Sequence, residues 1–192
     1  MPRAISFVWT SAPLVADAKT VTRRDWSPAY ARSFNAGEPL DAYDRRPDRG
    51  GEHLAVLRLT AAPTWEPQSQ MPDSDYAAEG WAWLYDYPEY APLQIDGLPI
   101  DPLQEFSRET FRLWQSRDYS QWVVRFELVE LLATDYLDRL LARLNRQRER
   151  RRRPPPERPV VVQLSLGHER PPTEAELEAL VQAHEQTQEP GR

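Results

Sequence analysis

The residue with the most distinctive chemistry in this chain is Lys19, the only lysine among 24 lysine and arginine residues. It lies in the segment 19–24, which reads KTVTRR. A desolvated ammonium group can lose its proton and then act as a base or a nucleophile, whereas a guanidinium group stays protonated in proteins. The isolated ammonium therefore makes Lys19 a candidate for catalysis. The alternative is that Lys19 and Arg24 belong to a solvated basic rim.

The composition removes several other kinds of chemistry. The chain has no cysteine, which excludes disulfides, thiolate metal sites and cysteine nucleophiles. Its three histidines, His53, His168 and His184, show no metal-ligand spacing, and its seven glycines form no phosphate-binding loop. We expect neither a metal nor another cofactor. No stretch of about 18 apolar residues or signal peptide is visible, so we expect a cytoplasmic protein without a membrane partner.

Charge is distributed unevenly along the chain. The net charge is −6, yet residues 135–158 contain nine arginines and four acidic residues. We therefore predict two regions, a main domain over 1–134 and a C-terminal extension over 135–192. A leucine stripe in this segment predicts a helix, and its arginines are candidates for nucleic-acid binding: Arg143, Arg146, Arg150, Arg151, Arg152 and Arg153. Alternatively, the leucines pack on the main domain and the arginines pair with its acidic groups.

The main domain has the pattern of an α+β protein. Short alternating or apolar runs predict strands at 4–9, 21–24, 40–43, 53–60 and 121–132. Helical spacing and capping residues predict one helix that begins near 73 and carries Trp83, and another over 101–114. This order favours a small, mostly antiparallel β-barrel with helices at its mouth. In the extension, an Arg-rich helix leads into prolines 154–156, a possible strand at 160–166 and a last helix from Thr173.

Five pieces of the sequence together resemble the ASCH domain, a member of the PUA-like superfamily. They are the segment 19–24, Gly37 before a strand, the strand segment 58–60, the segment 76–81 (YAAEGW) and the closing strand 122–128. The resemblance covers about residues 5–131. It implies a PUA-like β-barrel with a cleft between sheet and helix, and a role in handling RNA or nucleotides.

The resemblance also implies a reaction. Short bacterial members of the family hydrolyse the amide of N(4)-acetylcytidine with a lysine, a threonine and a glutamate, which look like Lys19, Thr22 and Glu79 here. An amide hydrolase needs a base or nucleophile, an oxyanion donor and a proton shuttle, and these three side chains can supply them. We also place five residues at the substrate, namely Thr20, Arg23, Arg24, Arg58 and Trp81. The resemblance gives Arg24 the family's second-arginine position, whose partner would be a carbonyl, ribose or phosphate of the substrate.

The chain departs from the short hydrolases in its length and in Arg23, which stands where they carry an apolar residue. Arg23 and Arg58 have a structural alternative, which is pairing with carboxylates across the sheet. Trp81 belongs to an aromatic group over 81–90 that can stack a base or simply pack a core. We expect a protein that recognises a nucleobase or RNA segment beside Lys19 and hydrolyses an N-acylated cytidine-type nucleoside or nucleotide. The alternatives are a non-catalytic RNA- or modified-base-binding module and a ribonuclease.

Overall fold

Strand β8 (Ser120–Leu131) is the longest strand of the described residues, and it pairs with three other strands of the sheet. The computed structural model describes residues 3–152. In it, β8 pairs antiparallel with β2 (Val21–Arg24) along one edge, and with β4 (His53–Leu59) and β5 (Thr64–Pro67) along the other. Valine and aromatic side chains predominate at positions 122–126 of β8, where four of the five residues are buried, and such residues favour a buried central strand. β8 therefore connects β2, the strand that follows Lys19, to β4 and β5.

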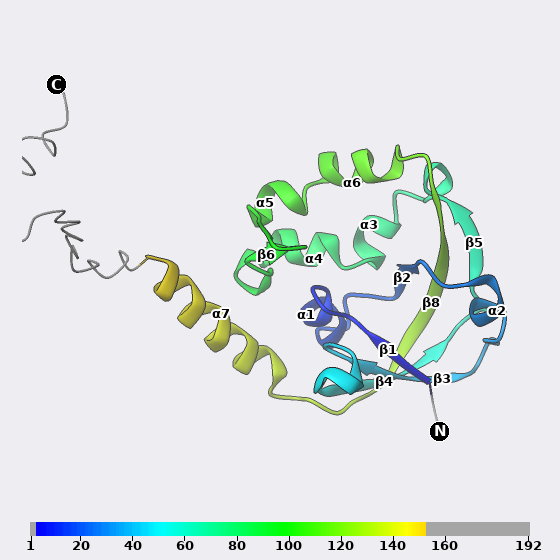
Figure 1. Ribbon diagram of the computed structural model, residues 1–192, viewed down its shortest axis with the longest axis horizontal. Helices are drawn as coiled ribbons and strands as arrows, with labels where there is room; N and C mark the ends of the chain where they lie inside the picture. The colour runs from blue at the N-terminus through cyan, green and yellow to red at the C-terminus, as the bar shows by residue number, and fades with distance from the viewer. Residues whose placement is uncertain (1–2, 153–192) are drawn as a thin grey trace, which may run out of the picture. The chain divides into compact units, whose positions relative to one another are not determined.

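The sheet continues from β4 through β3 (Pro39–Tyr43) to β1 (Arg3–Ser6), which pairs parallel with β3. The resulting order is β1-β3-β4-β8-β2, with β5 also on β8. The sheet curls into a half-barrel, as Figure 1 shows. The predicted α+β class and the predominance of antiparallel pairs are confirmed. Within residues 3–152 no strand pairing joins β1 to β2, so this sheet is open where a closed barrel was expected.

Helices cover the curled sheet on more than one side. Figure 1 shows α3 to α6 grouped together, α1 near the centre, and α7 along another side. The helices are α1 (Ser11–Val15), α2 (Pro28–Ala31), α3 (Asp75–Ala78), α4 (Trp81–Asp86), α5 (Pro102–Glu105), α6 (Arg108–Gln115) and α7 (Tyr136–Arg152). Three short 3-10 turns and one hairpin complete the fold: η1 (Pro47–Arg49), η2 (Gln68–Gln70), η3 (Pro88–Tyr90), β6 (Gln94–Ile95) and β7 (Leu98–Pro99). No helix of the described residues is both long enough and apolar enough to cross a membrane.

The two helices predicted in the main domain are each divided in the structure. Gly80 adopts a φ of +83° between α3 and α4, a left-handed conformation that ends the first helix. Between α5 and α6, Ser107 has extended backbone angles and its side chain accepts a hydrogen bond from the Thr110 amide. A serine in this role starts a new helix. The apolar spacing continues through both breaks, which is why the sequence pattern predicted uninterrupted helices.

Two hydrophobic clusters form the interior. The larger one joins the sheet to α1 and α7, and it includes Phe7, Leu57 and Phe126. The smaller one lies among the helices α3, α4 and α6 and centres on Trp81 and Phe111. Trp81 of this cluster, and Trp114 packed against it, also line the space beside Lys19, so the second cluster forms a separate wall of that space.

Helix α7 packs into the larger cluster. Tyr136, Leu140 and Leu144 are buried, which confirms the predicted leucine stripe, and the Tyr136 hydroxyl donates to Ser11 Oγ at 2.9 Å. The compact unit runs from Met1 to Arg153, so α7 belongs to it and the boundary predicted after residue 134 falls inside it. The predicted proline spacer, strand 160–166 and last helix lie outside the described residues.

Gly80→Ala should destabilise the protein more than a second glycine substitution with the same backbone angle. A Cβ at Gly80 would lie 2.6 Å from Pro13 Cβ, whereas Gly97, with a φ of +82°, has no atom within 4 Å of that position. The left-handed angle costs about 1–2 kcal/mol at both sites, and overpacking adds about 1–3 kcal/mol at Gly80 only.

Urea unfolding of Gly80→Ala and Gly97→Ala measures this difference. We expect a clearly larger loss of unfolding free energy for Gly80→Ala. Equal losses in the two variants would contradict the close packing of Gly80 on Pro13.

Candidate functional site

A cavity of about 500 Å³ lies beside β2, between the sheet and the helices α4 and α6. Its polar lining comes from β2 and its flanking residues, the end of α3 and the start of β8, and also from the β6–β7 turn, α5 and α6. Its aromatic lining comes from α4, α6 and the segment before α1. The lining residues are Trp9, Thr10, Lys19, Thr22, Arg23, Arg24, Asp25, Glu79, Trp81, Ile95, Asp96, Glu105, Thr110, Leu113, Trp114, Arg117, Tyr119 and Gln121.

Lys19 is held at this cavity by the backbone around it. The Thr20 amide donates to the Ala78 carbonyl at 2.9 Å, and the Thr20 carbonyl accepts from the Phe126 amide at 2.9 Å. These two bonds attach the lysine segment to the end of α3 on one side and to β8 on the other. The Lys19 side chain, only 1% exposed, donates to Glu79 Oε2 at 2.6 Å and to the Glu79 carbonyl at 2.8 Å. Two residues sixty positions apart in the chain thus meet in one hydrogen-bonded pair.

The environment of Lys19 favours loss of its proton. Burial lowers the pKa of the Lys19 amine below its ordinary value of 10.5, because the interior solvates an ammonium poorly. The Glu79 carboxylate opposes this shift, and the positive charges of Arg24 and Arg23 add to it. The net direction is downward. A neutral amine is therefore more accessible here than on an exposed lysine.

Glu79 also belongs to a larger buried ion network through Arg23. Arg23 Nη1 donates to Glu79 Oε1 at 3.0 Å, while Nη2 contacts Asp75 Oδ2 at 2.6 Å and Glu66 Oε1 at 2.7 Å. Burial lowers the pKa of Arg23, but the neighbouring carboxylates outweigh it and the net pKa is raised. Asp75 in turn accepts from Arg125 at 3.2 Å. The structural alternative for Arg23, pairing with carboxylates, is thus what the structure shows, although Arg23 also lines the cavity.

Thr22 and Arg24 line the cavity from β2. Thr22 is buried, and its hydroxyl makes no hydrogen bond with any side chain or backbone group in the part of the chain that the structure describes. Arg24 Nη2 donates to the Ser6 carbonyl at 2.7 Å, so its guanidinium links the edge strands β1 and β2. The same guanidinium lies 5.3 Å from the centre of the Phe7 ring. Burial lowers the pKa of Arg24, and its Nε has no partner in residues 3–152.

Trp81 forms the aromatic wall of the cavity. Its ring stacks on Trp114 with centroids 5.2 Å apart and an interplanar angle of 1°. Trp81 Nε1 is buried without a hydrogen-bond partner in residues 3–152. Trp114 Nε1 instead donates to the Tyr119 hydroxyl at 2.7 Å. The Trp81 indole N–H is therefore a buried donor without a hydrogen bond in the described residues.

Several lining residues were not predicted from the sequence, chiefly Trp9, Trp114 and Arg117. Trp114 was assigned to an apolar helix face, and that signal cannot distinguish a core position from a cavity wall. Nothing in the spacing of Trp9 or Arg117 indicates a site. Their placement depends on which helices pack across the cavity.

Two residues predicted to bind substrate lie outside the cavity. The Thr20 side chain is exposed, and the hydrogen bonds of this residue to Ala78 and Phe126 are made by its backbone. Arg58 lies on β4 with its side chain exposed and 3.5 Å from Glu127 on β8. The sequence resemblance placed both beside the site because it aligns segments and does not show which way a side chain points.

The α7 arginines lie apart from the Lys19 cavity. Those that the structure describes and the sequence analysis named are exposed, namely Arg143, Arg146, Arg150, Arg151 and Arg152. Arg153 lies outside the described residues. No group of three His, Cys, Asp or Glu side chains among residues 3–152 is arranged to hold a metal ion.

Asp75→Asn should destabilise the protein strongly, because it removes a buried charge that compensates Arg23 and Arg125. Breaking a buried ion pair costs about 3–5 kcal/mol. Asp48→Asn is the matched control, since Asp48 also contacts an arginine (Arg46) at 2.6 Å but is 60% exposed. We expect a change of at most about 0.5 kcal/mol for the control. Chemical denaturation of both variants checks the contrast, and a small effect of Asp75→Asn would contradict the role of the network.

No family model matches this chain, and no curated protein matches it. Among solved structures, it is similar to the crystal structure of protein EF3133 from Enterococcus faecalis V583, which is described by the family model DUF984. The TM-score is 0.38 and the sequence identity is 22%, over 68% of this chain and 78% of that chain. A similarity of this size assigns neither a family nor an activity, so the cavity is interpreted from its own residues.

Proposed function

We propose that this protein is an ASCH-type, PUA-like hydrolase that cleaves the amide bond of an N-acylated cytidine-type nucleoside or nucleotide in the Lys19 cavity. The observation that supports this most is the buried hydrogen bond of 2.6 Å between Lys19 and Glu79, beside Thr22, at the wall of one cavity. These three side chains are the set that the sequence resemblance implies for such a reaction.

The arrangement fits a hydrolysis in which a side chain can accept or donate the proton at each step. A neutral Lys19 amine takes a proton from water as the water oxygen adds to the acyl carbon. The Thr22 hydroxyl donates to the developing oxyanion. Lys19 then passes its proton to Glu79 through their hydrogen bond, and Glu79 gives it to the departing amino nitrogen as the C–N bond breaks. The products are a carboxylic acid and the free exocyclic amine of the base.

The rest of the cavity suits a planar, polar ligand. Its volume of about 500 Å³ falls within the ordinary range for small-molecule sites. Trp81 and Trp114, stacked on each other, form an aromatic wall against which a planar base can pack. Arg24 offers a further donor at the same cavity.

One observation favours a second candidate, a module that binds a modified base without turnover. Both carboxylate oxygens of Glu79 already accept hydrogen bonds, one from Lys19 and one from Arg23. A carboxylate held on both sides is suited to a fixed binding surface as well as to proton transfer. A ribonuclease, with Lys19 and Arg24 stabilising phosphate charge, is a third candidate. Lys19→Arg separates them, since a guanidinium retains the positive charge but cannot act as a base.

Lys19→Arg and Glu79→Gln should each lower turnover of N(4)-acetylcytidine by about a hundredfold or more, the contribution typical of acid–base groups. Release of acetate and cytidine is the measurement. Glu130→Gln is the matched control, because Glu130 is exposed on β8 and does not line the cavity. Absence of wild-type turnover by the folded protein, together with retained affinity for the nucleoside, would replace the hydrolase with the binding module.

The rate of turnover should rise with pH and level off below pH 10.5. The base must be the unprotonated amine, and burial lowers the pKa of Lys19 beneath that value. Below the lowered pKa the amine is protonated and inactive, and above it the amine is free. A pH–rate profile checks this expectation. A rate that is independent of pH, or that still rises through pH 10.5, would contradict a role for Lys19 as the base.

A further inference from the structure

A second cavity of about 500 Å³ adjoins the Lys19 cavity. Trp9 lines both of them. Two pairs of consecutive residues are divided between the cavities. Thr10 and Ile95 line the Lys19 cavity, whereas their neighbours Ser11 and Gln94 line the second cavity. The two cavities therefore share Trp9 and are lined by neighbouring residues of the same two segments. We call the second cavity the α7 groove, because α7 forms one of its sides.

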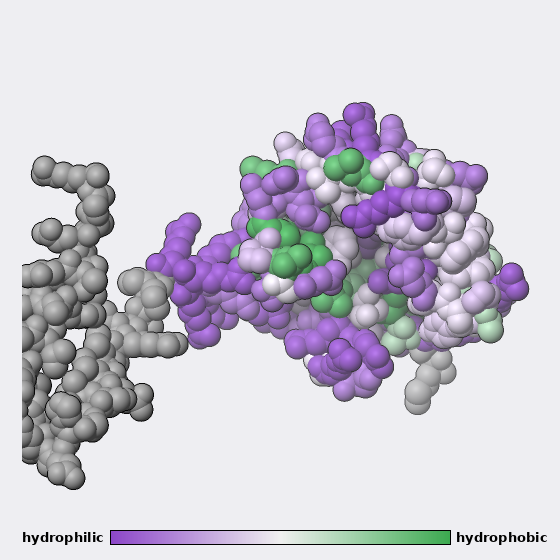
Figure 2. Space-filling view, turned by 45° about the horizontal axis from the view of Figure 1, so that its top comes forward, coloured by the Kyte–Doolittle hydropathy of each residue, from purple (hydrophilic) through white to green (hydrophobic). Residues whose placement is uncertain are grey.

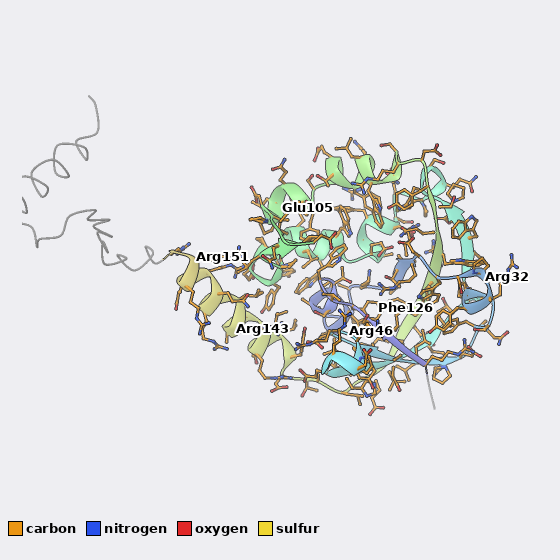
Figure 3. All side chains as sticks on the ribbon, viewed as in Figure 1. Arg32, Arg46, Glu105, Phe126, Arg143 and Arg151 are labelled. Atoms are coloured by element: carbon orange, nitrogen blue, oxygen red, sulfur yellow. The ribbon has the colours of Figure 1, made fainter. Side chains whose placement is uncertain are left out.

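The arginines that line the α7 groove differ from Arg139 of the same helix in whether they form ion pairs with carboxylates. Arg139, near the start of α7, forms ion pairs with both Glu52 and Asp135. By contrast, Arg143, Arg150 and Arg151 line the groove, and none of them forms an ion pair with a carboxylate of residues 3–152. Figure 3 labels Arg143 and Arg151 at two positions along α7. Among residues 3–152, these groove arginines thus carry positive charge without a carboxylate partner, on a chain whose net charge is −6.

Arg151 is also oriented by its neighbours. Its Nη1 donates to the Leu93 carbonyl at 3.3 Å, and its Nη2 contacts Gln94 Oε1 at 3.1 Å. Both partners are uncharged, so the guanidinium keeps its net charge for a ligand. It is fixed beside the point where Gln94 and Ile95 separate the two cavities.

The opposite lining of the α7 groove is apolar and aromatic. Val8, which is 68% exposed, lies there together with Trp9, Tyr90 and Leu93. Figure 2 shows the hydrophilic surface of α7, in purple, next to a hydrophobic patch, in green. Arginines on one side and aromatic groups on the other form the combination that binds single-stranded nucleic acid, with phosphates on the cations and bases on the rings.

From these observations we infer that the two cavities form one binding surface for a single-stranded RNA. The modified base occupies the Lys19 cavity, and the phosphate and base of a neighbouring nucleotide occupy the α7 groove beside Arg143, Arg150 and Arg151. This inference rests on the proposed function of the Lys19 cavity and names its substrate as an oligonucleotide instead of a free nucleoside. Because the protein outside residues 135–158 is strongly acidic, the α7 side offers a polynucleotide a favourable approach.

The test compares two doubly substituted variants of the full chain. Arg143→Ser/Arg150→Ser removes two cations from the α7 groove. The matched control is Arg146→Ser/Arg152→Ser, which removes the same charge from exposed positions of the same helix that do not line the groove. The probes are free N(4)-acetylcytidine and a short single-stranded RNA that contains one N(4)-acetylcytidine. Affinity for each probe is measured over a series of salt concentrations.

For the wild type we expect the RNA to bind at least about tenfold more tightly than the nucleoside, with a steep salt dependence. Arg143→Ser/Arg150→Ser should lose most of that advantage, and its slope of log affinity against log salt should become shallower by about 1.4, the value for two phosphate contacts on a single strand. Its affinity for the free nucleoside should not change. The control should retain most of the RNA affinity.

Two results would overturn the inference. One is equal loss of RNA affinity in the two double variants, which would indicate diffuse attraction to α7 and no specific groove. The other is a wild-type protein that turns over the nucleoside but prefers no RNA, which would leave the proposed hydrolase standing alone. RNA binding that depends on Arg143 and Arg150 without any turnover would instead support the binding surface and remove the hydrolase.

Discussion

The buried ion network around Glu79 is the constraint on which the rest of this structure depends. Lys19, Arg23 and Asp75 are each nearly inaccessible to solvent, and every one of them contacts an opposite charge at 2.6 Å. Charges removed from water cost several kcal/mol each unless they are closely paired, so the elements that carry them must keep their relative positions. Those elements are β2, the end of α3 and, through Glu66 and Arg125, the strands β5 and β8. The contacts that hold the helices against the sheet are therefore also the contacts that shape the site.

This arrangement leaves a particular division of roles. Arg23 has carboxylate partners on both of its terminal nitrogens and holds the geometry, whereas the carboxylate partner of Lys19 within residues 3–152 is Glu79 alone. Backbone contacts also fix the position of the end of α3. The Thr20 amide donates to the Ala78 carbonyl, and Gly80 packs so closely on Pro13 that a Cβ there would collide with it. A rigid guanidinium network thus surrounds one amine whose pKa is lowered by burial.

Much of the local structure was predictable, and most of the site's construction was not. The strands β2, β4 and β8 and the helix α7 follow from alternation and a leucine stripe, which are local signals. The breaks at Gly80 and Ser107 were missed because the apolar spacing continues across them. The sequence resemblance named Lys19 and Glu79 as members of one site but did not show that they meet. The partners of Arg23 depend on contacts between segments more than forty positions apart, which spacing does not encode. Thr20 and Arg58 were assigned to the site because an aligned segment does not indicate the direction of a side chain.

The proposed chemistry depends most directly on the protonation state of one amine, and the chain contains a single lysine. With lysine isotopically labelled at its side chain, an NMR titration follows one side-chain signal, that of Lys19, with no background from other lysines. The account predicts a pKa below 10.5 in the wild type and a further decrease in Glu79→Gln, because the Glu79 carboxylate is the partner that raises it. A Lys19 that titrates at the ordinary value, unchanged by Glu79→Gln, would contradict the buried pair and the chemistry proposed for it.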